Sequence, residues 1–270
     1  MSEHSVSGQV ASKDGTVIAY DRVGHGPALI LIVGALCSRT VGPSVKLSPL
    51  LASQFTVFSY DRRGRGQSGD RAPYQVAREI EDLEALIAEA GGSSFVFGHS
   101  SGALLGLQAA ARGLPIRKLA LYEAPLMVDR SRPPMQQEWL KIRNYIAQGR
   151  RREALEVFLK SVGLPSLVIA IMRWLPVWSK IEAIAHTLPY DGAISQQFQT
   201  GEPLPTGVWA NVTSPVLAIV GGKSPSWMQS GTRALVNALS NAQQRTLAGQ
   251  THDASANALA PVLADFFGRN

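Results

Sequence analysis

The most constraining feature of the sequence is a short glycine-rich turn between a predicted strand and a predicted helix. Residues 94–97 have the apolar character of a buried strand, and small residues over 103–112 predict a closely packed helix. The turn between them, residues 98–102, reads Gly-His-Ser-Ser-Gly and matches the pattern Gly-x-Ser-x-Gly. Such a turn is strained and needs its glycines, and it presents its central side chain at the end of the strand. Ser100 is therefore the first candidate for a reactive residue.

Short apolar runs recur along the chain and alternate with helical patterns. Helices are predicted over 76–90, where apolar residues at helical spacing oppose a row of acidic ones, and over 256–267. The apolar runs that predict strands are 17–20, 28–33, 56–60, 94–97, 118–122, 216–220 and 245–247. Continuous apolar strands that alternate with helices indicate a parallel sheet covered on both faces.

The alternation stops in the middle of the chain. No strand is predicted between 129 and 205, whereas helices are predicted over 135–148 and 151–162. The strand pattern then resumes. We therefore expect a helical insertion, residues 129–205, in a core domain formed by residues 1–128 and 206–270.

Composition excludes several classes of protein. A single Cys in 270 residues permits neither an internal disulfide nor a multi-cysteine zinc or iron–sulfur site. The polar N-terminal residues do not resemble a secretory signal, and no apolar run approaches the roughly 18 residues of a membrane span. We expect a cytoplasmic protein without stable membrane insertion.

The net charge of +6 is concentrated in the insertion. Residues 129–180 contain ten Lys or Arg against four Asp or Glu, and the rest of the chain is balanced. A basic patch can attract an anionic ligand, a membrane or a nucleic acid, but a solvated helix face explains the same charges. Because the basic residues accompany no known reading element, no nucleic-acid partner is expected.

A serine hydroxyl becomes an effective nucleophile only when a base removes its proton. Among the five His residues, His252 lies in the loop between the last predicted strand and the last predicted helix. That loop belongs to the edge where parallel strands end, which is where open sheets bind ligands. His99 is part of the turn itself and would point away from its neighbour's hydroxyl. His252 is therefore the candidate base.

Taken together, these features resemble the α/β-hydrolase fold family from the first strand to the last helix. Residues 98–102 resemble the family's nucleophile elbow, and residues 60–68, Tyr-Asp-Arg-Arg-Gly-Arg-Gly-Gln-Ser, resemble its structural Asp-x-Arg-Gly-x-Gly-x-Ser turn. The resemblance implies a mostly parallel, eight-stranded sheet covered by helices on both faces. It also identifies residues 129–205 with the family's helical cap, inserted after strand 6. The fold hosts many chemistries, so it indicates the substrate only generically.

The first departure from the family pattern concerns the oxyanion hole. Members usually carry His-Gly after the third strand, where this chain has Val33-Gly34. Because the hole is built from backbone N–H groups, the resemblance still implies the N–H groups of Ala35 and Ser101 as its donors. Gly34 would line the substrate site and keep this loop close to the nucleophile.

The second departure concerns the acid that orients the base. The family's acid normally follows the seventh strand, but Ser224 stands there and cannot carry a negative charge. Some members place the acid at the end of the sixth strand, where this chain has Glu123. The alternative role for Glu123 is a structural carboxylate, and Asp253 and Asp129 are weaker candidates for the acid. The substitution Ser224→Asp is expected to restore a conventional acid if the loop geometry allows it.

The resulting prediction is a hydrolase that uses Ser100 as nucleophile, His252 as base and Glu123 as acid, and that forms an acyl-enzyme without a metal or organic cofactor. Dehalogenases and epoxide hydrolases of this fold carry Asp at the elbow, so Ser100 argues against both. Alternative functions are a thioesterase, a lyase or cyclase resembling hydroxynitrile lyase that reuses the same triad, and a ligand-binding protein with little turnover.

The expected partner is a small, largely apolar ester or lactone, because tryptophans are frequent in the insertion. The candidate substrate-binding residues there are Trp139, Trp174 and Trp178. The same side chains could instead pack the insertion. The sequence leaves lid mobility and a homodimer open.

Overall fold

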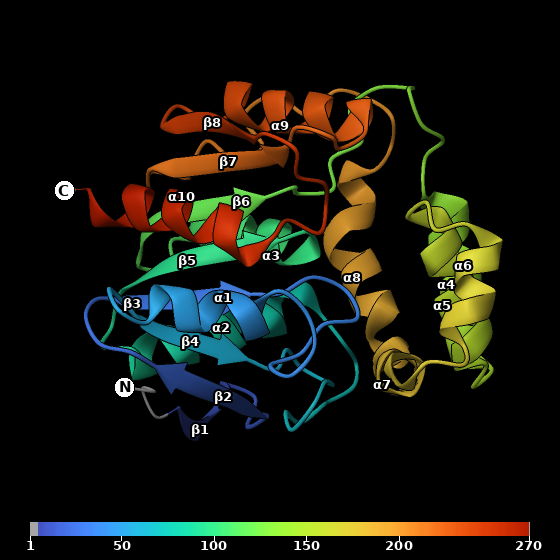
Figure 1. Ribbon diagram of the computed structural model, residues 1–270, viewed down its shortest axis with the longest axis horizontal. Coiled ribbons are helices and arrows are strands. Elements are labelled where there is room, and N and C mark those ends of the chain that lie inside the picture. Colours follow the sequence, from blue (N-terminus) through green and yellow to red (C-terminus); the bar gives the residue numbers. More distant parts are fainter. Residues whose placement is uncertain (1–4, 270) are drawn as a thin grey trace.

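The computed structural model describes residues 5–269, and within them the chain forms an eight-stranded sheet with helices on both faces (Figure 1). The strand order is β1-β2-β4-β3-β5-β6-β7-β8. The strands are β1 (Val6–Ala11), β2 (Val17–Val23), β3 (Ala28–Ile32), β4 (Thr56–Tyr60), β5 (Ser94–His99), β6 (Ile116–Tyr122), β7 (Val216–Gly221) and β8 (Ala242–Leu247). The α-helices are α1 (Ser44–Leu51), α2 (Val76–Glu89), α3 (Ser101–Ala111), α4 (Gln136–Ala147), α5 (Arg151–Ser161), α6 (Ser166–Met172), α7 (Pro176–Ile184), α8 (Leu188–Ser195), α9 (Ser226–Asn237) and α10 (Ala256–Gly268).

The sheet is mostly parallel, as the continuous apolar runs predict. From β4 to β8, neighbouring strands pair in parallel, whereas β2 is antiparallel to both of its neighbours. In β3, Leu29 and Leu31 face one hydrophobic cluster, and Ile30 and Ile32 face the other. Burial on both faces is what favours a run of apolar residues over an alternating one.

Each face of the sheet has its own layer of helices. Helices α1 and α10 pack against each other and cover the face that includes Leu29 and Phe97. Helices α2, α3 and α9 contribute to the cluster on the opposite face, which includes Ile30 and Val96. This arrangement confirms the predicted fold class.

Strand β1 is the part of the sheet that the sequence pattern does not reveal. Its residues read Val-Ser-Gly-Gln-Val-Ala and are exposed or half-buried, so no apolar run marks it. It pairs with β2 from Val6–Arg22 to Ala11–Val17 at one edge of the sheet. Pairing with β2, rather than burial, therefore defines this strand.

The residues between β6 and β7 form helices α4 to α8 and contain no strand, in agreement with the sequence pattern. Helices α4 to α7 stand beside the end of the sheet toward which β6 and β7 point (Figure 1). Helix α8 packs against α4 and α5 on one side and against α2 and α3 on the other. It therefore joins the inserted helices to the layer that covers the sheet. Across residues 5–269, none of the helices is both long enough and apolar enough to cross a bilayer.

Candidate active site

Ser100 occupies a strained turn between β5 and α3. Its φ of 55° and ψ of −125° lie in a region that residues other than glycine rarely adopt. Its N–H donates to the carbonyl oxygen of Tyr122 at 2.9 Å, which ties the turn to the end of β6. The strand–turn–helix arrangement that the Gly-x-Ser-x-Gly pattern requires is therefore present at the carboxyl edge of the sheet.

Three glycines allow the backbone to approach closely around this turn. A Cβ at Gly98 would lie 2.5 Å from the Ala103 Cα, and a Cβ at Gly102 would lie 2.3 Å from the Ile32 carbonyl oxygen. A Cβ at Gly34 would lie 2.8 Å from the Ser100 Cβ. The loop after β3 therefore lies directly against Ser100, which is the close approach expected of Gly34.

Glu123 and His252 come from distant parts of the sequence and meet at this edge of the sheet. The His252 Nδ1 lies 2.8 Å from the Glu123 Oε2, and because a carboxylate only accepts, Nδ1 carries the proton. The other carboxylate oxygen accepts from the Gly221 N–H at 2.8 Å and from the Ser224 hydroxyl. The Glu123 side chain is fully buried, whereas 40% of the His252 side chain is exposed. The carboxylate is thus shielded while its imidazole partner remains accessible.

The surroundings of Glu123 favour its charged form. Burial by itself raises the pKa of the carboxyl, but hydrogen bonds from His252, Ser224 and the Gly221 N–H outweigh it and hold the pKa below its ordinary value. Glu123 also has a φ of 48°, and its N–H donates to the Ile219 carbonyl oxygen at 3.0 Å. A strained backbone held in place by its neighbours is typical of functional positions.

Ser224 is the residue whose part in the site the sequence does not indicate. It follows β7, where the acid was expected, and its hydroxyl donates to Glu123. Asp253 is exposed, and Asp129 accepts hydrogen bonds from Ser131. The Nδ1 of His252, which an orienting acid would contact, is hydrogen-bonded to Glu123 and to neither of these two aspartates.

His99 lies next to His252 rather than serving as a second base. The two rings have centroids 4.8 Å apart, and the His99 Nε2 lies 3.2 Å from the His252 carbonyl oxygen. Because that oxygen only accepts, Nε2 carries the proton. Burial, together with the nearby His252, lowers the pKa of His99 to about 3, so its ring is neutral. His99 therefore helps to fix the loop that carries His252.

A second charged cluster lies on the other side of the turn and consists of Arg62, Arg65, Glu79 and Asp191. The Arg62 Nη1 and the Arg65 Nη2 each lie 2.7 Å from a different oxygen of Asp191. Arg62 also donates to both oxygens of Glu79, at 2.7 and 2.9 Å. All four side chains are buried, and we call this group the arginine cluster. Burial by itself raises the pKa of Asp191, but the two guanidiniums outweigh it and hold that pKa below its ordinary value.

The arginine cluster holds the two backbone segments that the sequence assigns to the oxyanion hole. Arg65 donates to the carbonyl oxygens of Gly34 and Cys37, at 2.6 and 3.2 Å, on either side of Ala35. The Ser101 hydroxyl donates to Asp191 at 2.7 Å. Because Asp191 belongs to α8, the same carboxylate connects the insertion to the turn.

Asp191 was not singled out from the sequence. It lies in residues 188–194, Leu-Pro-Tyr-Asp-Gly-Ala-Ile, where it is the single charged residue of a mostly apolar stretch. A carboxylate in such a stretch needs a buried cationic partner. Residues 60–68, with three arginines close together, could have pointed to those partners.

The three tryptophans expected to bind substrate lie in different environments. Trp139 and Trp178 are buried, and their Nε1 groups donate to Gln199 and Glu182, at 2.7 and 2.5 Å. Trp174 is 90% exposed. Their contact with a substrate stays a prediction.

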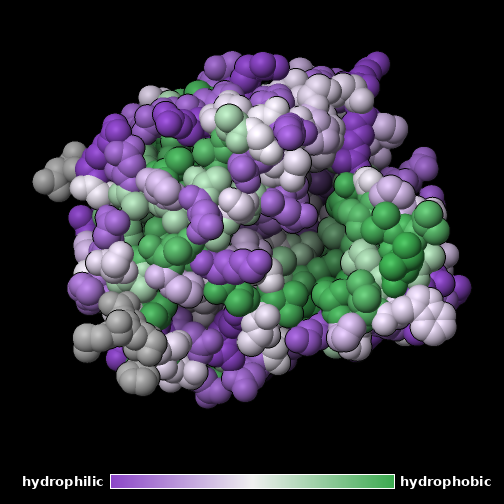
Figure 2. Space-filling view, in the orientation of Figure 1, coloured by the Kyte–Doolittle hydropathy of each residue, from purple (hydrophilic) through white to green (hydrophobic). Residues whose placement is uncertain are grey.

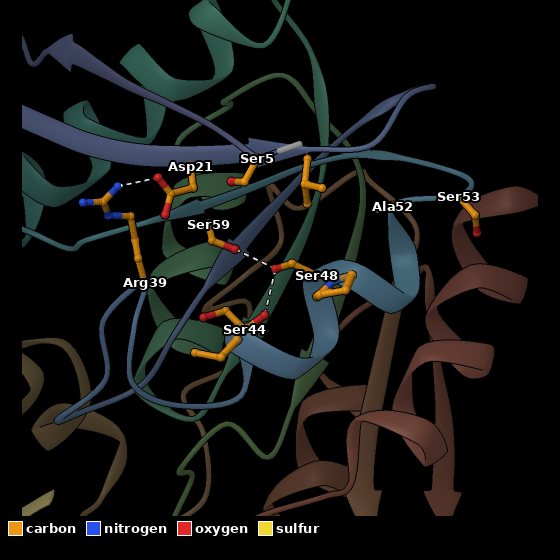
Figure 3. A pocket seen from close by; sticks show the side chains of 11 residues that line it. Ser5, Asp21, Arg39, Ser44, Ser48, Ala52, Ser53 and Ser59 are labelled. Atoms are coloured by element: carbon orange, nitrogen blue, oxygen red, sulfur yellow. Dashed lines mark hydrogen bonds and ion pairs between the residues drawn. The ribbon is translucent and has the colours of Figure 1, made fainter. Parts of the chain in front are cut away.

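A cavity of about 660 Å³ lies elsewhere, between α1 and strands β2 and β4 (Figure 3). Its lining includes Asp21, Arg39 and several serines, but not Ser100 or His252. Figure 3 shows two hydrogen-bonded contacts among its polar side chains: Ser48 with Ser59 at 2.8 Å, and Arg39 with Asp21 at 2.7 Å. This cavity is separate from the site around Ser100.

Comparisons with known proteins agree with this architecture. A model of the alpha/beta hydrolase family matches residues 29–263. The structure of an alpha/beta hydrolase from Sphaerobacter thermophilus is 46% identical with a TM-score of 0.88, and the match covers 96% of this chain and 100% of that one. A hydrolase from Pseudomonas aeruginosa is 23% identical with a TM-score of 0.76, over 97% of this chain and 98% of that one. An enol-lactonase from Burkholderia xenovorans is 20% identical with a TM-score of 0.71, over 97% and 100%. The last two likenesses concern the fold alone.

Proposed function

This chain belongs to the alpha/beta hydrolase family, and from that premise we propose that it is a serine hydrolase acting on a small, largely apolar ester or lactone. The observation that carries the proposal is the Glu123–His252 pair. Its buried carboxylate and accessible imidazole are 2.8 Å apart at the sheet edge that also holds Ser100 in its strained turn. A nucleophile, a base and an orienting acid are the three groups that acyl transfer to water requires.

In the proposed mechanism, Glu123 fixes the tautomer of His252. With the Nδ1 proton directed at the carboxylate, Nε2 is the nitrogen that accepts the proton of the Ser100 hydroxyl as its oxygen attacks the carbonyl carbon. The imidazole becomes cationic in this step, and the nearby negative charge of Glu123 stabilises it. The Ser224 hydroxyl and the Gly221 N–H help to keep that charge in place.

The negative charge that develops on the carbonyl oxygen would be held by the N–H groups of Ala35 and Ser101. His252 then gives its proton to the leaving alcohol oxygen as the carbon–oxygen bond breaks, which leaves an acyl group on Ser100. Water repeats the sequence with His252 as base, releasing the acid and the free serine. The arginine cluster supports this step because it holds the backbone on both sides of the proposed hole.

An apolar substrate is supported by the side chains near the loop after β3. Leu36, in this loop, and Met127, which follows β6, belong to one hydrophobic cluster with Trp139 and Trp178 of the insertion. This cluster extends from the proposed oxyanion hole into the inserted helices, so an apolar group beside Ser100 would meet apolar neighbours. One protein of the same fold is an enol-lactonase, which shows that the fold accommodates lactone chemistry.

The proposal is tested by measuring hydrolysis of a panel of p-nitrophenyl esters and simple lactones, with Ser100→Ala as the matched control. We expect turnover of at least one short apolar ester, an acyl mass on the wild-type chain after rapid quenching, and neither in the variant. Turnover that survives in Ser100→Ala, or a folded protein inactive on every ester and lactone tested, would contradict the proposal.

A further inference from the structure

A large apolar surface on the insertion has no partner within the described chain. It is formed by α6, the turn that follows it and the start of α7, and we call it the α6–α7 surface. Its members are Leu167, Val168, Ile171, Trp174, Leu175 and Val177. Leu167 is 73% exposed and Trp174 is 90% exposed. Single exposed apolar residues are common on soluble proteins, but several close together in the chain are not. Figure 2 shows a broad hydrophobic area on the side of the molecule where Figure 1 places α4 to α6.

The packing of these helices explains only part of their apolar character. Ile169 of α6 and Trp178 of α7 are buried in the hydrophobic cluster of the insertion. A helix that packs on one side normally carries polar residues on the other. Helix α6 instead reads Ser-Leu-Val-Ile-Ala-Ile-Met, with no charged residue, and both of its sides are apolar. The exposed side of α6 would therefore be stabilised by contact with an apolar environment outside the chain.

The charged residues within the segment that forms the α6–α7 surface are all basic, and the acidic residues Glu156 and Glu182 lie just outside it in the sequence. Residues 157–181 contain Lys160, Arg173 and Lys180 and no Asp or Glu, and all three basic residues are exposed. Arg173 contacts Glu156 at the border of this stretch. An apolar area with a cationic border complements a surface whose apolar interior lies behind negative charges.

We propose that the α6–α7 surface binds reversibly to anionic lipid bilayers. Trp174 and Leu167 would enter the boundary between headgroups and acyl chains, where the amphipathic ring of Trp is favoured. Lys160, Arg173 and Lys180 would lie at the level of the lipid phosphates. This is peripheral binding, in which the protein rests on the membrane and does not span it.

The same charges argue against a second copy of this chain as the partner. A two-fold dimer through this surface would bring the same patch together from both copies. The basic residues of one copy would then lie near those of the other, and the flanking carboxylates Glu156 and Glu182 already pair with Arg173 and Arg152 of their own chain. A bilayer with anionic headgroups removes this repulsion.

The proposal does not depend on the proposed hydrolase function, because it concerns residues outside the site and is measured as binding. The experiment is sedimentation of the full chain with vesicles of phosphatidylcholine alone and with vesicles that also contain phosphatidylserine. We expect binding to the anionic vesicles that weakens as salt is added, and much weaker binding to the neutral ones. Ser100→Ala should bind as the wild type does.

Two sets of variants separate the apolar and ionic contributions. Trp174→Ala combined with Leu167→Ala should weaken binding at least about tenfold, because both side chains would leave the interface. Lys160→Gln combined with Lys180→Gln should weaken it about 25-fold, since each cation near an anionic surface contributes roughly fivefold. The control is Leu50→Ala, an exposed apolar residue of α1 on another part of the molecule, which should bind normally.

Several results would overturn the proposal. One is the absence of binding to anionic vesicles by wild-type protein that thermal unfolding shows to be folded. Another is binding that the Trp174 and Leu167 substitutions leave unchanged. A third is a stable dimer in sedimentation equilibrium that the same substitutions dissociate, because a second copy would then cover the surface.

Discussion

Two charged clusters contact the residues on either side of Ser100, and they differ in how water reaches them. His252 of the first contacts His99, and Asp191 of the second contacts Ser101. In the first, a fully buried Glu123 is paired with an imidazole that is 40% exposed. In the arginine cluster, every charged side chain is at most 2% exposed. The difference separates a pair able to exchange a proton from a group of fixed charges.

The chemistry of the side chains follows the same division. An imidazole gains or loses a proton near neutral pH, whereas a guanidinium stays charged at any pH a protein meets. The Glu123–His252 pair is therefore suited to proton transfer. The arginine cluster is suited to holding backbone segments in register. Substitutions in the first should change the rate of catalysis, and substitutions in the second should change stability first.

The largest expected effect is that of Glu123→Gln on the rate. A neutral amide cannot stabilise the imidazolium or enforce the Nδ1–H tautomer of His252, so the hydrolytic rate should fall by about 10⁴, as for the corresponding change in a serine protease triad. The free energy of unfolding should change far less, because the amide keeps the size of the side chain. Steady-state kinetics and urea unfolding provide the two measurements. Near-normal turnover would remove Glu123 from the mechanism, and the two clusters would then not differ in their role in catalysis.

Asp191→Asn should lower the stability of the protein more than Glu123→Gln does. It leaves Arg62 and Arg65 buried beside a neutral group, and breaking a buried ion pair in this way costs about 3–5 kcal/mol of unfolding free energy. Urea unfolding measures it, with Glu202→Gln as the control, because Glu202 forms an exposed ion pair with Arg130 that contributes little. Equal stability of the two variants would show that the arginine cluster is not what holds this region.

Ser224 offers a smaller test within the first cluster. Ser224→Ala removes a hydrogen bond to a charged carboxylate, so the free energy of unfolding should fall by about 1.5–3 kcal/mol, and the rate should fall less than in Glu123→Gln because the carboxylate itself remains. Ser224→Asp should be worse, because it places a second carboxylate against Glu123 and raises the pKa of the pair. From the sequence alone, Ser224→Asp is expected to restore a conventional acid if the loop geometry allows it, whereas the contact between Ser224 and Glu123 leads us to expect a loss of activity. An activity gain in Ser224→Asp would show that the acid can move to that position.

Acidification should destabilise the protein gradually. The pKa values of Glu123 and Asp191 lie below their ordinary values of 4.5 and 3.8, so the unfolded chain takes up protons first as the pH falls. Their stabilisation is complete above about pH 5 and is lost as the pH drops through the lowered values. Unfolding free energy measured across this range should fall less steeply in Asp191→Asn than in the wild type. Parallel curves would assign the acid sensitivity to other groups.

The residues of the first cluster could be predicted from local sequence patterns. The turn at 98–102 was located because a strand, a glycine pattern and a helix are adjacent in the chain. Glu123 and His252 could be paired in advance because both follow parallel strands, whose ends meet at one edge. In each case a local pattern was enough once the fold was assumed.

The arginine cluster, strand β1 and helix α6 could not be predicted from local sequence patterns. Asp191 meets Arg62 and Arg65 only because α8 packs between the inserted helices and α3, a tertiary contact without a local signal. Strand β1 is defined by pairing with β2, and α6 lacks the polar face that marks a surface helix. These features depend on neighbours distant in sequence, or on an environment outside the chain.

Activation of Ser100 by the Glu123–His252 pair can be measured by labelling with a fluorophosphonate and locating the modified residue by mass spectrometry. If Glu123 and His252 activate Ser100, the wild type should carry a single adduct on Ser100, Ser100→Ala should carry none, and Glu123→Gln should react much more slowly. A folded wild-type protein without an adduct on Ser100, or with equal labelling rates in the wild type and Glu123→Gln, would contradict the account.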